Sequence, residues 1–87
     1  MLADRDQRYR MRLNNWVQTY PLHVRPMLQW DSSEALHDSS GNTYFVICVY
    51  ISDHLYGLGQ HHSKRRAREI AAREAIHCLA REGYSVA

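Results

Sequence analysis

The chain is poor in residue types on which several protein classes depend. Its 87 residues include two cysteines, Cys48 and Cys78, each within an apolar segment and without a CxxC or HxxxH pairing. This argues against a disulfide framework or a zinc site and predicts reduced core thiols in an intracellular protein, cytoplasmic or nuclear. No apolar run approaches the roughly 18 residues of a membrane span, and the charged start MLADRDQRYR lacks the apolar centre of a secretory signal.

Positive charge is missing from the middle of the sequence. Residues 32–60 contain three acidic residues and no Lys or Arg, a balance of −3. Residues 1–31 contain five Arg and three Asp, a balance of +2, and residues 61–87 contain six cations and three Glu, a balance of +3. If the two ends form helices on one side of a sheet, their cations form a basic face.

Hydrophobic periodicity predicts a helix at each end of the chain. Residues 5–20 carry an apolar stripe at helical spacing that Pro21 ends. Ser63 is a good N-cap for a second helix that reaches about Arg81 and is terminated by Gly83. Its predicted buried stripe consists of Ala67, Ala71, Ala75, Cys78 and Leu79.

Three strands are predicted between the helices, at residues 26–31, 43–51 and 55–60. The polar stretch DSSEALHDSSGN is the longest predicted loop, and the turn SDH lacks the Asn-Gly of a tight hairpin. The fold class is therefore α+β in the order α-β-β-β-α, a three-stranded antiparallel sheet with two helices packed on one face. One domain spans residues 5–82, with short flanking termini at 1–4 and 83–87.

Four cations occupy the five positions from Lys64 to Arg68, at the start of the last helix. A helix N-terminus already carries partial positive charge, so cations are disfavoured there unless an anion binds. Phosphate suits both the free N–H groups of the helix and the guanidinium forks. A solvated basic turn is the alternative for the cluster taken alone.

The stretch GLGQHHSKRRAREIAAREAIHCL resembles the end of the double-stranded RNA-binding domain (dsRBD) family, whose pattern is G-x-G, a short loop and S-K-K-x-A-K-x-x-A-A. YFVICVYI falls where the family has its F-x-V-x-V strand, and MRLNNW resembles the family's first-helix segment with L-N-E. The resemblance covers residues 8–81. The matching positions at the chain's end are Gly57, Gly59, Ser63, Lys64, Arg65, Ala67, Arg68, Ala71, Ala72, Ala75 and Leu79.

The resemblance implies a three-part contact with A-form RNA, whose shallow minor groove is recognised by shape over about 16 base pairs. The last helix would bridge phosphates through Lys64, Arg65 and Arg68. The first helix would enter one minor groove with Met11 and Asn15, while Arg12 reaches a flanking phosphate. The loop would enter the next groove with Ser39, Ser40 and Gly41.

Three departures from the family's pattern bear on affinity. Asn15 stands where the family has Glu, and Gly41 stands where the family's loop has His. His61 and His62 replace the usual Gly and Lys before the helix. His62 is expected to contact phosphate, and binding is expected to strengthen at mildly acidic pH because protonated imidazoles add positive charge.

These patterns predict a module of an RNA-processing, RNA-editing or RNA-silencing protein that binds double-stranded RNA largely independently of sequence. The prediction includes no catalytic activity, cofactor, metal, membrane or small-molecule substrate. No spacing supports a metal site at His54, His61 and His62 or a nucleophile pair of Cys48 and His62. The alternative function is a protein-interaction or dimerisation module of the same fold with weak or no RNA binding, in which another protein or a second copy is the partner.

Overall fold

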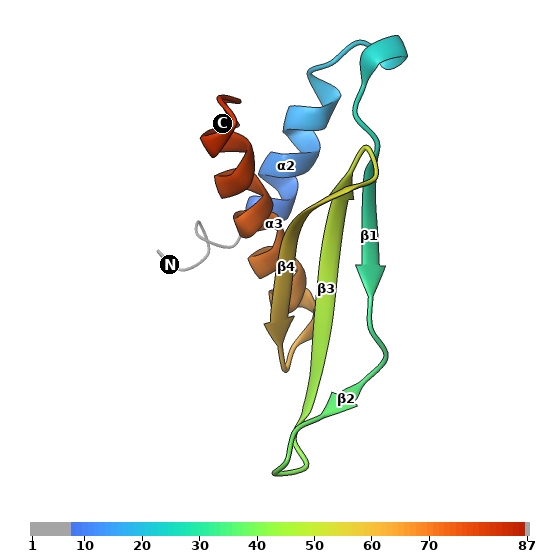
Figure 1. Cartoon of the computed structure of the whole chain (residues 1–87), viewed down its shortest axis with the longest axis vertical. Coiled ribbons are helices and arrows are strands. Elements are labelled where there is room, and N and C mark those ends of the chain that lie inside the picture. The colour runs from blue at the N-terminus through green and yellow to red at the C-terminus, as the bar shows by residue number, and fades with distance from the viewer. Residues whose placement is uncertain (1–7, 87) are drawn as a thin grey trace.

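A computed structural model describes residues 8–86, whose helices and strands follow the predicted order (Figure 1). Residues 5–7 of the predicted first helix and the flanking residues 1–4 lie outside this range. The elements are α2 (Tyr9–Gln18), η1 (Leu22–Val24), β1 (Leu28–Ser32), β2 (Leu36–His37), β3 (Thr43–Ile51), β4 (His54–His61) and α3 (Lys64–Arg81).

The sheet is antiparallel and is built around β3, the longest strand. β1 pairs with one edge of β3, with Leu28 opposite Ile51, and β4 pairs with the other edge. The short strand β2 pairs with the start of β3 through Leu36 and Tyr44. The expected three-stranded sheet therefore has a fourth short strand within the predicted loop, because two residues are too short for alternation to be visible in a sequence.

The turn between β3 and β4 is a two-residue hairpin, although its sequence lacks the residues that favour one. Ser52 and Asp53 both have positive φ, 49° and 72°. Ile51 and His54 pair directly on either side of them. Left-handed backbone at both central positions matches the right-handed twist of the strands, which explains why the chain adopts it without Asn-Gly.

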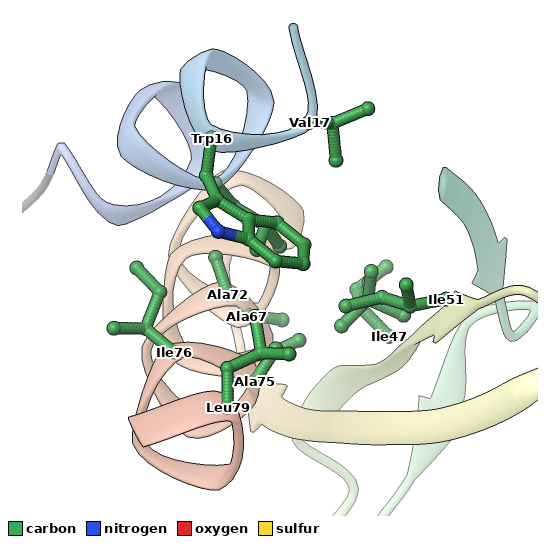
Figure 2. Packing of buried hydrophobic residues seen from close by; sticks show 12 residues of the cluster. Trp16, Val17, Ile47, Ile51, Ala67, Ala72, Ala75, Ile76 and Leu79 are labelled. Atoms are coloured by element: carbon green, nitrogen blue, oxygen red, sulfur yellow. The ribbon is translucent and has the colours of Figure 1, made fainter. Parts of the chain in front are cut away.

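Both helices lie on one face of the sheet, with α3 against the strands and α2 against α3 (Figure 1). Side chains alternate along β3, so Ile47, Val49 and Ile51 point into the core while Cys48 faces the uncovered side of the sheet. Trp16 and Val17 of α2 meet the alanine-rich surface of α3 and the β3 isoleucines (Figure 2). The core contains Leu13, Trp16, Val17, Ile47, Val49, Ile51, Ala67, Ala71, Ala72, Ala75, Ile76 and Leu79.

The glycines of β4 allow α3 to lie directly on the sheet. A Cβ atom at Gly57 would collide with the backbone of Ala71 and Ala75, and one at Gly59 with the backbone of Ala67 and Ala71. The alanine stripe of α3 faces these glycines, and the absence of large side chains on both elements permits the close approach. This close contact holds the start of α3 at the end of β4.

The C-terminal end of α3 is as predicted. Gly83 ends α3 in left-handed backbone, with φ of 96°, and its N–H donates to the Ala80 carbonyl while the Tyr84 N–H donates to the Leu79 carbonyl. Both cysteines are free, as expected, but they are half-buried rather than part of the core. No helix within residues 8–86 is long and apolar enough to cross a bilayer.

Candidate nucleic-acid interface

The start of α3 concentrates cations that form no ion pair with a carboxylate among residues 8–86. Ser63 caps the helix, because its Oγ accepts a hydrogen bond from the Arg66 N–H at 3.3 Å. Lys64 and Arg65 are exposed, and Arg68 is half-buried. Within residues 8–86 an ion pair joins Arg73 to Glu74, about two and a half helical turns away from Lys64. The first turns of α3 therefore present cations and a helix N-terminus to solvent.

The turn between β2 and β3 projects from the same end of the sheet as the start of α3 (Figure 1). The Nδ1–H of His62 donates to the Thr43 carbonyl at 2.7 Å, which ties the residues before α3 to the start of β3. The Lys64 Nζ lies 5.4 Å from the centre of the Phe45 ring, a cation–π contact. His62 and Asp38 also line the same shallow hollow, so the turn and the residues just before α3 share one surface.

Asp38 gives this turn its shape. Its Oδ1 accepts hydrogen bonds from the N–H groups of Ser40 and Asn42, both at 2.9 Å, and Gly41 has a φ of 86°. The Asn42 N–H is the main cause that holds the pKa of Asp38 below its ordinary value of 3.8, with smaller contributions from Ser40 and His62. The carboxylate is therefore turned toward the amides of its own loop, while Ser39, Ser40 and Gly41 are exposed.

His61 and His62 have different tautomers. A carbonyl oxygen can only accept a hydrogen bond, so Nδ1 of His62 carries a proton. The other ring nitrogen, Nε2, takes no part in this hydrogen bond. Nδ1 of His61 accepts from the Ser63 N–H at 3.0 Å and therefore carries none. His61 supports the helix cap, whereas His62 is exposed on the surface where phosphate binding was predicted.

α2 borders the basic end of α3 on its other side. Met11 and Asn15, one turn apart on the helix, are both exposed, and Met11 lines one hollow together with Arg68. The guanidinium of Arg12 lies 5.3 Å from the centre of the Tyr9 ring and is half-buried, so this side chain is held against α2 itself.

A carboxylate of α3 caps α2. Oε1 of Glu69 accepts from the Tyr9 N–H at 2.8 Å and from the Arg10 N–H at 3.3 Å. Arg8, at the N-cap position, makes no side-chain capping bond of its own. The negative charge of Glu69 is favourable at the positive end of α2, and it fixes the position of α2 relative to α3.

The predicted residues thus fall into three neighbouring groups, one on α2, one on the β2–β3 turn and one around the start of α3. Their individual contacts with RNA remain predictions. Sequence reasoning missed Glu69, whose partners are about 60 residues away in the chain, and also Arg10, Asn14 and Trp30, which line the hollow beside Met11. The Asp38 turn could have been predicted, because Asp followed by Ser, Ser and Gly is typical of turns in which Asp bonds to nearby amides.

The histidines before α3 are engaged with the backbone and with each other. Among residues 8–86, no three His, Cys, Asp or Glu side chains are grouped closely enough to hold a metal ion. His61 and His62 pack edge to face, with ring centres 5.9 Å apart, and their Nδ1 atoms bond to backbone groups.

Comparison with known proteins identifies one family. The model of the double-stranded RNA binding motif matches residues 9–79, which include α2, the sheet and most of α3. No curated protein matches the chain.

Proposed function

This chain belongs to the double-stranded RNA-binding motif family, and from that premise we propose that it binds A-form RNA duplexes by shape, largely independently of sequence, as a module of an RNA-processing, editing or silencing protein inside the cell. The family's domain is a binding domain and not a catalytic one. Its partner class is double-stranded RNA.

The observation that carries the proposal is the contact of three elements around the start of α3. The β2–β3 turn is joined to it by the His62–Thr43 hydrogen bond, and α2 is joined to α3 by Glu69. A duplex that places its phosphates at Lys64 and Arg65 would have α2 and the turn on either side, where successive minor grooves lie. The molecule is 46 Å long, so one face can span more than one groove.

The proposed contacts differ in what they would recognise. Lys64, Arg65 and Arg68 would bind phosphate oxygens, which carry no sequence information. Contacts with minor-groove edges and 2′-hydroxyls would come from Met11 and Asn15 on α2 and from Ser39, Ser40 and Gly41 on the turn. The 2′-hydroxyls distinguish RNA from DNA. Asp38 is exposed in the same turn, and its carboxylate accepts hydrogen bonds from the Ser40 and Asn42 amides, which partly offset its negative charge.

The proposal is tested by titrating the domain with a duplex RNA of about 20 base pairs and with duplex DNA of the same sequence across a salt series. We expect RNA to bind more tightly, and the affinity to fall with salt because phosphate contacts release counterions. The double variant Lys64→Ala/Arg65→Ala should bind at least tenfold more weakly and show a shallower salt dependence, with unchanged thermal stability because both side chains are exposed.

The matched control removes the same number of charges from α3 away from its basic start, one from the middle of the helix and one from its last residue. Arg73 and Arg81 are exposed in α3, so Arg73→Ala/Arg81→Ala should retain the parent's RNA affinity apart from a small general charge effect. If both double variants lost RNA affinity equally, binding would depend on the net charge of the domain and not on the position of Lys64 and Arg65. A parent that binds no duplex RNA would favour the alternative, a protein-interaction module.

That alternative has an observation in its favour on the far side of the sheet. Leu55 and Leu58 are 53% and 48% exposed on the face that the helices leave uncovered, next to half-buried Tyr44, Val46 and Tyr50. An exposed group of apolar side chains of this kind is typical of protein contacts. Sedimentation equilibrium of the free domain distinguishes a monomer from a self-associating module, independently of the RNA titration.

A further inference from the structure

A hollow of about 490 Å³ opens between α2, β1 and the start of α3. It is lined by Arg10, Met11, Asn14, Trp30 and Arg68. Three of these residues come from α2 and the other two from elements far from it in the sequence. The volume is within the range of pockets that bind small organic groups.

The architecture explains why an aromatic ring lies in this hollow. Trp30 pairs with Val49 across β1 and β3, so both side chains point to the face that carries the helices. β1 is at the edge of the sheet, where α3 no longer covers it, and Trp30 is therefore half-buried rather than enclosed. Met11 is 54% exposed at the rim of the same hollow.

The polar groups in the hollow have the chemistry of a phosphate and base site. Neither guanidinium, that of Arg10 or of Arg68, has a carboxylate partner among the described residues, and two guanidiniums suit one phosphate group. The amide of Asn14 can donate to and accept from a base edge. Trp30 and Met11 supply an apolar contact for a planar ring.

We infer that this hollow receives one unpaired ribonucleotide attached to the duplex, with its base against Trp30 and Met11 and its phosphate between Arg10 and Arg68. A base inside a duplex is stacked on its neighbours and presents only its edge, so it cannot use an aromatic partner. The inference rests on the proposed function, since Met11 and Arg68 also belong to the proposed duplex surface. It adds a preference for RNA that carries a bulged nucleotide or a single-stranded end.

The test compares three RNAs at fixed salt by fluorescence anisotropy. They are a perfect duplex of 20 base pairs, the same duplex with one extra adenosine bulged from the middle, and the same duplex with a two-nucleotide 3′ overhang. Base stacking on an aromatic side chain predicts that an RNA with an unpaired nucleotide binds roughly tenfold more tightly than the perfect duplex. Preference for the bulge alone or for the overhang alone identifies which kind of unpaired nucleotide enters the hollow.

Two variants and one direct measurement locate the preference. Arg10→Ala, at an exposed position, should reduce the ratio of the two affinities to near one, whereas Arg73→Ala should keep it. Trp30→Ala should do the same as Arg10→Ala, and if this variant fails to fold, the NMR signal of the Trp30 indole N–H in the parent replaces it. That signal should shift with the bulged or overhanging duplex and much less with the perfect one.

The outcomes separate this inference from the proposed function. Equal affinity for all three RNAs, with duplex RNA still bound, overturns the inference and leaves the proposed function intact. A preference that persists in Arg10→Ala, or an unmoved Trp30 signal, also overturns it, because the preference would then arise from RNA flexibility. Failure to bind any duplex RNA overturns both.

Discussion

His61 and His62 show at the scale of single residues how neighbours in sequence take different roles. Nδ1 of His61 accepts from the Ser63 N–H and so supports the cap of α3. Nδ1 of His62 donates to the Thr43 carbonyl, which leaves the rest of an exposed ring beside Lys64. We therefore expect the predicted acid-strengthened binding to depend on His62 more than on His61, because His61 is half-buried and held by the cap.

We predict that RNA affinity is higher at pH 6 than at pH 8 and that His62→Ala removes most of this difference. A protonated imidazole adds one positive charge next to the phosphate that His62 is proposed to contact. One added charge beside a phosphate in water is worth about 1 kcal/mol, or roughly fivefold in affinity. Anisotropy titrations at fixed salt measure the effect. The control is His77→Ala, an exposed position on α3 far from Lys64, and an unchanged pH dependence in His62→Ala would contradict the assignment.

The second prediction concerns the titration of Asp38 in the β2–β3 turn. Hydrogen bonds from Asn42 and Ser40 lower the pKa of its carboxyl, so the folded turn favours the ionised form. The resulting contribution to the order of the turn is fully present above the ordinary pKa of 3.8 and is lost as the pH falls through the lower pKa of the folded state. An NMR titration should place the midpoint of Asp38 below 3.8, and the amide signals of Ser40 and Asn42 should follow it.

The control for Asp38 is a peptide of residues 36–44, in which the turn is not held by the sheet. Its Asp38 should titrate at the ordinary value. Identical midpoints in the peptide and the domain would mean that the loop hydrogen bonds do not form in solution.

At the scale of elements, the contact of α3 with β4 positions the basic helix end. Gly57 and Gly59 face the alanine stripe so closely that the helix backbone occupies the space of a side chain. A shift of α3 away from the sheet would also move Lys64 and Arg65 relative to the β2–β3 turn. The packing of two elements therefore determines the geometry of the proposed interface.

Gly57→Ala should lower the free energy of unfolding by roughly 1–3 kcal/mol or more, because its Cβ would displace the backbone of α3. Urea denaturation followed by circular dichroism measures the change. Gly41→Ala is the comparison: it has no neighbour within 4 Å, but its φ of 86° strains a side chain, so a loss of about 1 kcal/mol is expected. A smaller loss for Gly57→Ala than for Gly41→Ala would show that α3 does not lie this close to β4.

At the scale of the whole molecule, the two ends of β3 have separate roles. The β2–β3 turn and the start of α3 lie at one end of the sheet, and the Ser52–Asp53 hairpin lies at the other (Figure 1). Changes at the hairpin should therefore alter stability without altering RNA binding. Because Ser52 and Asp53 have left-handed backbone, residues that favour this backbone should raise the stability of the domain when placed there.

Ser52→Asn/Asp53→Gly should raise the free energy of unfolding by about 1 kcal/mol, since Asn-Gly adopts this turn with less strain. For a domain of this size the midpoint of thermal unfolding should rise by about 4–8 °C. The RNA affinity should stay within twofold of the parent's. Ser52→Ala/Asp53→Ala is the control and should lower the midpoint, and a fall in the Asn-Gly variant would contradict the observed turn.

Much of the fold was predictable because its signals are local. The Ser63 cap, the alanine stripe and Gly83 all act within a few residues of α3, and each was confirmed. β2 was missed, since its pairing with β3 depends on a partner strand and not on its own two residues. Cys78 was placed in the core by periodicity, but it lies at the edge of the buried stripe, where packing and not spacing decides exposure.

By itself, the sequence determined the order of elements, the family and the residues that carry charge at the start of α3. These follow from hydrophobic period, capping residues and a motif, all of which operate along the chain. The tertiary structure alone decided that Glu69 caps α2, that His62 is joined to Thr43, and that Trp30 shares a hollow with Arg10 and Arg68. The Glu69 hydrogen bond joins residues 60 positions apart in the chain, and the His62 hydrogen bond joins residues 19 positions apart. Such contacts form only when packing brings these segments together.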